Sequence, residues 1–122
     1  LAETYYNLGV AYHKKGDFKK SITALNKAIK LKKDFPEAYY TLGVVYEELS
    51  SNLLKDQNKN NIVTAVENYQ KSRDSYAKYL KITVNPDDLE NIKSRIEFLD
   101  SEIAKYKTEI KNNIPVQHSV GG

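Results

Sequence analysis

Apolar residues recur three and four positions apart along most of this 122-residue chain, which is the spacing of one face of an α-helix. Within residues 2–15 one such face is formed by Tyr5, Leu8, Gly9 and Tyr12. Within residues 18–32 the face expected to be buried is formed by Ile22, Leu25, Ala28 and Ile29. Between them, Gly16 can adopt the left-handed conformation that ends a helix, and Asp17 can cap the next one. The pattern therefore predicts a helical hairpin.

A second, longer hairpin follows. Asp34 and Glu37 are spaced as a capping pair, with Pro36 in the first turn of the helix that they begin. The helical pattern continues through Leu49 and Leu53 and is followed by a polar turn at 56–61. A fourth helix is predicted over residues 62–82, with Tyr76, Tyr79 and Leu80 extending its apolar face.

The last predicted helix covers residues 86–112 and starts at Asn85-Pro86-Asp87-Asp88, where a cap residue and a proline precede acidic residues. Its apolar residues follow a heptad pattern: Leu89, Ile92, Ile96, Leu99, Ile103, Tyr106 and Ile110. Pro115 is expected to stop the helix and residues 114–122 to form a disordered tail. The surplus length of this helix is expected to pack against residues 75–82.

The first helices of the two hairpins also have similar sequences. Seven residues of the first helix find the identical residue 34 positions later: Glu3, Tyr5, Tyr6, Leu8, Gly9, Val10 and Tyr12. A fixed period of this length is typical of stacked helix–turn–helix repeats. Aligning Ala65 with Ser21 and Tyr69 with Leu25 predicts a ten-residue insertion in the second unit.

On these residues the chain resembles the tetratricopeptide repeat (TPR) family over about residues 2–72. It departs from the family pattern in having Tyr where Trp is common and Lys33 where the first repeat usually ends in Pro. The prediction is an all-α fold: an antiparallel helix-hairpin array of two TPR units, the second with elongated helices, and a long C-terminal capping helix. The units are residues 1–34, residues 35–82 with an insertion at 50–61, and the capping helix at 83–113.

The resemblance implies a protein-binding groove lined by the first helix of each repeat. The corresponding positions are Glu3, Tyr6, Asn7, Val10 and His13, then Glu37, Tyr40, Thr41, Val44 and Glu47. Tyr6 and Tyr40 occupy equivalent positions in the two repeats, outside the helix face that is expected to be buried. Tyrosine is enriched at protein interfaces, so this recurrence favours a role in binding. In the alternative, the two rings pack against each other or against a neighbouring helix.

The partner implied is a protein or peptide segment, helical or extended, with an apolar or aromatic anchor. Family members that hold chaperone C-terminal carboxylates use Lys and Asn where this chain has Tyr6 and Val10, so that ligand is not expected. A second hypothesis is self-association through the heptad helix. A third is binding of RNA or an anionic surface by residues 14–33, which contain eight lysines and only one acidic residue, an aspartate. Nucleic acid is disfavoured because this stretch has no arginine.

Composition narrows the function further. The chain has no cysteine, so it has no disulfide or thiolate metal site, which is compatible with a reducing compartment. It also lacks methionine, and we interpret it as a piece of a longer protein. His13 and His118 have no catalytic partner at a motif spacing, and no glycine-rich phosphate loop is present, so neither catalysis nor a cofactor is predicted.

Overall fold

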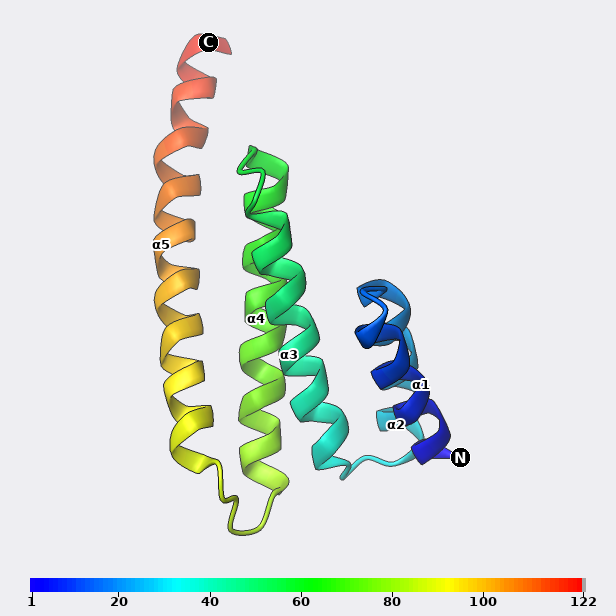
Figure 1. Cartoon of the computed structure of the whole chain (residues 1–122). Helices are drawn as coiled ribbons and strands as arrows, with labels where there is room; N and C mark the ends of the chain where they lie inside the picture. The colour runs from blue at the N-terminus through cyan, green and yellow to red at the C-terminus, as the bar shows by residue number, and fades with distance from the viewer. Residues whose placement is uncertain (122) are drawn as a thin grey trace.

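The computed structural model describes the backbone of residues 1–121 and the side chains of residues 1–113. Over this range the chain forms five α-helices and no strand: α1 (Ala2–Lys14), α2 (Phe18–Leu31), α3 (Pro36–Leu53), α4 (Lys59–Ile82) and α5 (Leu89–Gly121). The α1–α2 hairpin, the longer α3–α4 hairpin and α5 stand side by side in that order (Figure 1). The predicted all-α hairpin architecture is therefore confirmed.

The first hairpin turns where the sequence predicted. Gly16 has a φ of +79°, the left-handed conformation that follows the end of α1. The Asp17 carboxylate accepts a 3.2 Å hydrogen bond from the Lys20 backbone N–H and so caps α2. A polar turn also separates α3 from α4, but α4 begins earlier than predicted, because Asn58 accepts a hydrogen bond from the Asn61 N–H.

The predicted capping of α3 by Asp34 and Glu37 is wrong. The residue at the N-cap is Phe35, which makes no side-chain cap, so Asp34 lies one residue too early to cap this helix. The Phe35 side chain is instead buried beside Ala2 and Ala38. Packing of this ring, together with Pro36 in the first turn, therefore sets the start of the helix.

Two hydrogen bonds show how the hairpins correspond. The Ser21 hydroxyl donates to the Gly9 carbonyl at 2.7 Å, and the Ser72 hydroxyl donates to the Gly43 carbonyl at 2.6 Å. The serines are 51 positions apart and the glycines 34, so the second hairpin contains 17 extra residues, not the ten predicted. Alignment of Ala65 with Ser21 was therefore wrong.

The error has a physical origin. Ser50 lies seven residues after Gly43, and Ala65 lies seven residues before Ser72. The Ser50 hydroxyl donates a 2.9 Å hydrogen bond to the Ala65 carbonyl, which makes a second buried contact between small residues of the two helices. Small residues let α3 and α4 approach closely at both levels. Because Ala65 and Ser72 lie on the same helix face, either one fits the repeat pattern when the sequence is read alone.

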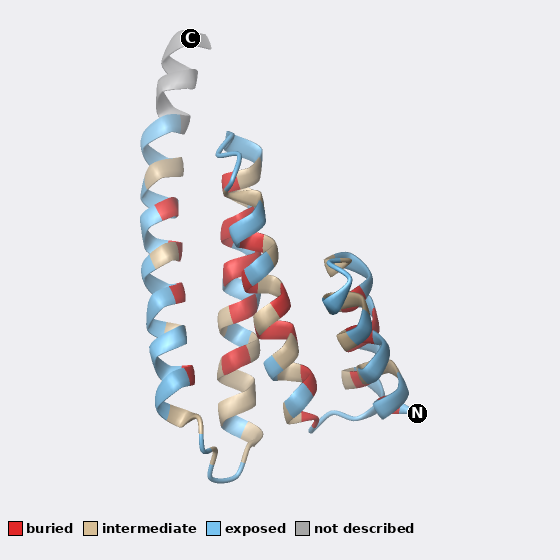
Figure 2. Cartoon of the chain, viewed as in Figure 1, coloured by how far each residue is buried: buried red, intermediate tan, exposed pale blue. Residues whose placement is uncertain are grey.

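The contact between α4 and α5 uses the heptad residues. Ile92, Leu99, Ile103 and Tyr106 are buried in one cluster with α4 residues that include Tyr69 and Tyr76. Figure 2 shows the buried positions of α5 along the side that faces α4. The packing includes Tyr79 and Leu80 of residues 75–82, where the surplus length of this helix was expected to pack, and it extends along α4 beyond them.

Both ends of α5 differ from the prediction. The helix begins at Leu89 and not at Pro86, and Asn85, the predicted cap residue, has a left-handed φ of 51°. The Asp88 carboxylate accepts hydrogen bonds from the Tyr79 hydroxyl at 2.9 and 3.1 Å. The backbone stays helical to Gly121, past Pro115, since a proline removes one helical hydrogen bond and leaves the others in place. The side chains of the predicted tail, residues 114–122, lie outside the described part of the chain.

Candidate functional site

A hollow with a volume of about 640 Å³ lies between α3 and α5. The two helices flank α4 and make no close backbone contact with each other, so side chains alone form the floor of the hollow. Residues of α3 and α4 that line it are Tyr40, Val44, Glu47, Glu48, Ser51 and Tyr76. Those from α5 are Asn91, Ile92, Ser94, Arg95 and Phe98.

A buried carboxylate forms the centre of the floor. Glu47 is only 7% exposed, and its Oε2 lies 2.8 Å from a guanidinium nitrogen of Arg95. Its Oε1 accepts a 3.0 Å hydrogen bond from Arg95 Nε and a 3.2 Å hydrogen bond from the Tyr76 hydroxyl. Charge-assisted bonds of this kind are stronger than neutral ones, so they fix α5 at a set distance from α3.

The same network affects ionisation. Burial, followed by the negative charge of Glu47, raises the pKa of the Tyr76 hydroxyl far above its ordinary value. Burial alone would lower the pKa of Arg95, but Glu47 and Tyr76 outweigh it and raise that pKa. The floor therefore contains a charged guanidinium and a neutral phenol across the physiological pH range.

Aromatic rings stand on both walls. Phe98 of α5 is 47% exposed although it is a large apolar residue, and Tyr40 of α3 is exposed as well. The Tyr40 ring makes edge contacts with Tyr76 and Tyr79, at centroid separations of 5.9 and 5.5 Å. These contacts hold the Tyr40 ring in place while leaving part of it open to a partner.

Of the positions that the TPR resemblance implied on α3, Tyr40, Val44 and Glu47 line the hollow. Glu37 is exposed and does not line this hollow. The Thr41 hydroxyl donates a 2.8 Å hydrogen bond to the Glu37 carbonyl. Glu47 lies beneath the surface and is already paired with Arg95. It therefore does not offer a partner a free carboxylate.

The positions implied on α1 lie apart from this hollow. Tyr6 packs on Phe35 with the ring centroids 5.2 Å apart, and Glu3 pairs with Lys32 at 3.1 Å. His13 Nε2 lies 2.7 Å from Glu48 Oε2, which links α1 to the wall of α3. Asn7 is exposed and Val10 is half-buried.

Tyr6 and Tyr40 do share a smaller hollow of about 190 Å³, which continues the groove towards α1. Its other lining residues are Glu37, Tyr79 and Asp88. Neither ring lies in the packed interior, since Tyr6 is half-buried and Tyr40 exposed. The two tyrosines thus line one surface. The Tyr6 ring packs on Phe35, and the Tyr40 ring packs on Tyr79.

The α5 wall was missed by the sequence analysis. The resemblance extended only to about residue 72, and the heptad pattern identifies the seam of α5 but not the residues beside it. Two signals were available in the sequence. Phe98 is a large apolar residue outside the heptad seam, and Arg95 is one of only two arginines in the chain.

The side chains that the structure describes contain no group of three or more His, Cys, Asp or Glu residues placed to hold a metal ion. Among the helices of the described residues, none combines the length and apolar character needed to span a bilayer.

The fold and the hollow together define an all-α helical-hairpin repeat protein with an open groove between helices. Comparison with protein-family models identifies the repeat: residues 11–50 match the model described as TPR repeat. The match supports a tetratricopeptide repeat over these residues, and such repeats generally serve as protein–protein interaction modules. The match includes α2 and most of α3, whereas α4 and α5 lie outside it. No curated protein matches the chain.

Proposed function

We propose that this chain is a non-catalytic interaction module that binds a protein segment in the hollow between α3 and α5. In this proposal residues 1–34 and 35–82 form two TPR units, and residues 83–113 form the capping helix that supplies the second wall. The observation that carries the proposal is the pair of partly exposed rings, Tyr40 and Phe98, which belong to different helices and line the same hollow.

The shape and chemistry of the hollow favour a segment with an apolar or aromatic anchor. Val44 and the two rings offer apolar surface, whereas Glu47 and Arg95 satisfy each other's charges below it. A partner therefore has no unpaired charge to neutralise at the floor, and burial of its anchor supplies the favourable free energy. An affinity near micromolar, about −8 kcal/mol, is expected for a site of this kind.

The groove continues towards α1 in this proposal. A segment longer than the anchor would pass Glu37 and Thr41 and reach the hollow shared by Tyr6 and Tyr40. Glu3, Asn7, Val10 and His13 are then the outer contacts on α1. Among these residues Tyr6 contributes to folding as well as to binding, because its ring packs on Phe35.

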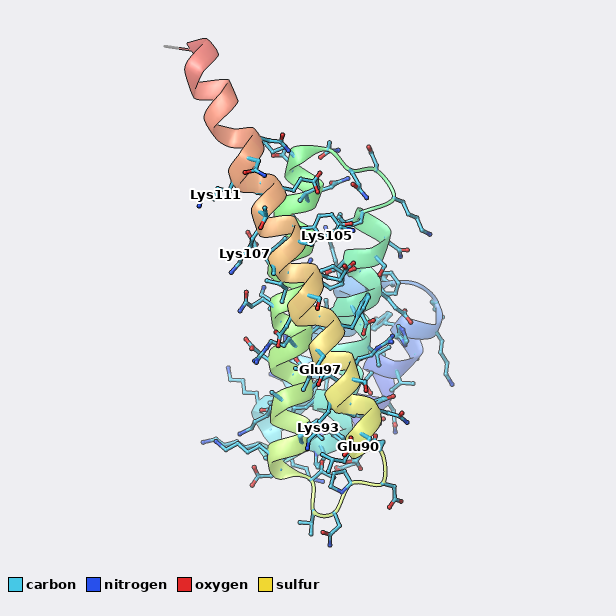
Figure 3. The ribbon with its side chains drawn as sticks, turned by 90° about the vertical axis from the view of Figure 1, so that its left-hand side faces the viewer. Glu90, Lys93, Glu97, Lys105, Lys107 and Lys111 are labelled. Atoms are coloured by element: carbon cyan, nitrogen blue, oxygen red, sulfur yellow. The ribbon has the colours of Figure 1, made fainter. Side chains whose placement is uncertain are left out.

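Self-association through the heptad helix is the less favoured alternative. The seam of α5 is already buried against α4 within one chain. Figure 3 shows the opposite side of α5, which carries charged residues of both signs: Glu90, Lys93, Glu97, Lys105, Lys107 and Lys111. A monomer in sedimentation equilibrium over a wide concentration range is the expected result.

The groove can be tested with peptides selected from a random display library against the immobilised chain. Binding of a selected peptide is measured by fluorescence anisotropy for the wild type, Phe98→Ala and Tyr40→Ala. Each substitution should weaken binding at least tenfold, since about 1.4 kcal/mol of anchor contact is removed. Thermal melts of each variant separate lost binding from lost folding.

Leu31→Ala is the matched control, because Leu31 is 46% exposed, nearly the same as Phe98, and lies on α2 outside the hollow. It should leave the affinity unchanged. Selected peptides that bind Phe98→Ala and Tyr40→Ala as tightly as the wild type would contradict the proposal.

A further inference from the structure

The small hollow of about 190 Å³ at the α1 end of the groove differs in its chemistry from the larger one. Three of its five lining residues are tyrosines from three different helices: Tyr6 of α1, Tyr40 of α3 and Tyr79 of α4. The other two are Glu37, in the first turn of α3, and Asp88, directly before α5. The lining therefore combines aromatic rings with carboxylates and contains no basic side chain.

The rings are held in place by aromatic contacts. The centroids of the Tyr40 and Tyr79 rings lie 5.5 Å apart with an angle of 62° between their planes, so these two rings meet at a corner. The Tyr6 ring is held by Phe35, at a centroid separation of 5.2 Å. Aromatic rings attract a cation placed over their faces. A set of rings that is already positioned therefore favours a cationic ligand.

The carboxylates of this hollow have no cation of the chain beside them. Among the described residues, neither Glu37 nor Asp88 forms an ion pair, whereas Glu47 in the larger hollow is paired with Arg95. Both oxygens of Asp88 accept from the Tyr79 hydroxyl, at 2.9 and 3.1 Å, which fixes the position of this carboxylate. Burial, followed by the hydrogen bond to Asp88, raises the pKa of Tyr79, so its hydroxyl keeps the proton that it donates.

We propose that this hollow binds the guanidinium group of an arginine in the partner segment. The inference rests on the proposed function for its partner, because the arginine belongs to the segment whose apolar anchor lies between α3 and α5. Tyr40 lines both hollows, so the anchor and the arginine bind next to each other. The partner segment is therefore recognised by two neighbouring side chains of different chemistry.

The carboxylates select arginine among the cations that aromatic rings attract. A quaternary ammonium group has no N–H to donate, so it would bring Glu37 and Asp88 no hydrogen bond. The lysine ammonium group does donate, but it is a compact and strongly hydrated charge. The guanidinium group is planar and weakly hydrated, stacks on aromatic rings and carries several N–H donors around its edge. It can contact a tyrosine with its face and a carboxylate with its edge.

Peptides from a display library test the proposal against the intact chain. Every library member contains one tryptophan as the anchor, flanked by random residues, and arginine should be enriched close to the tryptophan among the selected peptides. One selected peptide is then compared, by fluorescence anisotropy, with versions in which its arginine is replaced by citrulline, lysine or trimethyl-lysine. Citrulline has nearly the same shape without the charge, so it should weaken binding about tenfold. Lysine and trimethyl-lysine should also bind more weakly than arginine, and added salt should reduce the advantage of arginine.

Variants of the chain show whether the arginine lies in this hollow. In Glu37→Gln/Asp88→Asn the replacement by citrulline should weaken binding by about threefold or less, because the rings remain and the carboxylates are gone. Glu37→Gln alone should give an intermediate loss. The matched control is Glu97→Gln, since Glu97 is also an exposed glutamate but lies on the outer side of α5 (Figure 3). It should keep the full loss. Thermal melts check folding, because a carboxylate in the first turn of α3 also stabilises that helix end.

Three results would overturn the proposal. In the first, the selected peptides lack arginine, or the citrulline version binds as tightly, while Phe98→Ala still weakens binding; the proposed function would then stand without the arginine site. In the second, citrulline weakens binding equally in the wild type and in Glu37→Gln/Asp88→Asn, which would place the arginine elsewhere. In the third, trimethyl-lysine binds more tightly than arginine, which would assign the hollow to a quaternary ammonium group.

Failure of the proposed function gives a different result. Phe98→Ala would then leave the affinity unchanged, while the loss on replacement by citrulline would still depend on Glu37 and Asp88. That outcome would support the arginine site and contradict an anchor between α3 and α5.

Discussion

Replacing Arg95 with methionine should destabilise the fold more than its exposed position suggests. Methionine retains the length and the apolar stem of the side chain but removes both bonds to Glu47. The carboxylate would then keep only the Tyr76 hydroxyl as a partner in a site where it is 7% exposed. A charge without its counter-ion in such a site is costly.

The burial of each partner sets the magnitude. Removing one partner of a fully buried ion pair costs about 3–5 kcal/mol, whereas an exposed pair contributes about 0–1 kcal/mol. Glu47 is buried but Arg95 is half exposed, so water can reach part of the carboxylate once the guanidinium is gone. We therefore expect Arg95→Met to lower the free energy of unfolding by about 1–3 kcal/mol, between the two limits.

Urea unfolding at neutral pH, followed by circular dichroism, measures this cost. Glu47→Gln and the double variant Glu47→Gln/Arg95→Met complete a thermodynamic cycle. The double variant should be more stable than Arg95→Met alone, because the amide needs no counter-ion. The chain offers a matched control in Arg73→Met, since Arg73 makes a 2.7 Å pair with Asp100 on the exposed side of the α4–α5 contact. This control should cost less than about 1 kcal/mol.

The reasoning would be refuted if Arg95→Met cost no more than Arg73→Met, or if the effects of the two substitutions at Glu47 and Arg95 were additive. Either result would mean that the pair is solvated and does not hold α5 against α3.

The remaining predictions concern the core. Leu99→Ala should lower the free energy of unfolding by about 2–5 kcal/mol, because Leu99 is fully buried against α4; a change within error in urea unfolding would mean that the seam is not packed. Gly43→Ala should destabilise by about 1–3 kcal/mol despite the better helix propensity of alanine, since a Cβ there would lie 2.6 Å from the buried Tyr76 ring; an alanine variant as stable as the wild type would contradict the close helix contact. The raised pKa of Tyr76 means that the unfolded chain releases this proton near pH 10 while the folded chain keeps it, so the stability it contributes is complete below about pH 10 and falls as the pH rises further. Urea midpoints measured above about pH 10 should show this fall in stability, and Tyr76→Phe should make it less steep. If the pH dependence were unchanged in Tyr76→Phe, the fall would have to come from other groups.

The sequence predicted the helices well, because their faces and caps are local properties. Gly16 and Asp17 ended one helix and began the next, as their conformational and hydrogen-bonding preferences require. The register of the second hairpin could not be obtained in this way. Ala65 and Ser72 are one heptad apart and both make close contacts, so only their hydrogen bonds in the folded chain distinguish them.

The candidate site was predictable only on its α3 side. Tyr40 was identified because it repeats Tyr6, but no pattern in the sequence places Phe98 opposite it. That placement depends on how far α5 lies from α3, which is a consequence of packing on α4 and of the Glu47–Arg95 pair. Exposed aromatic residues outside a heptad seam are therefore the useful signal in chains of this kind.

The α3–α5 groove is tested most directly by the amide NMR spectrum of the labelled chain, titrated with a peptide selected against it. The account predicts that the shift changes gather on the two walls, at Tyr40 and Val44 on one side and at Asn91 and Phe98 on the other. Shift changes confined to α1 and α2, with those two walls unaffected, would contradict it.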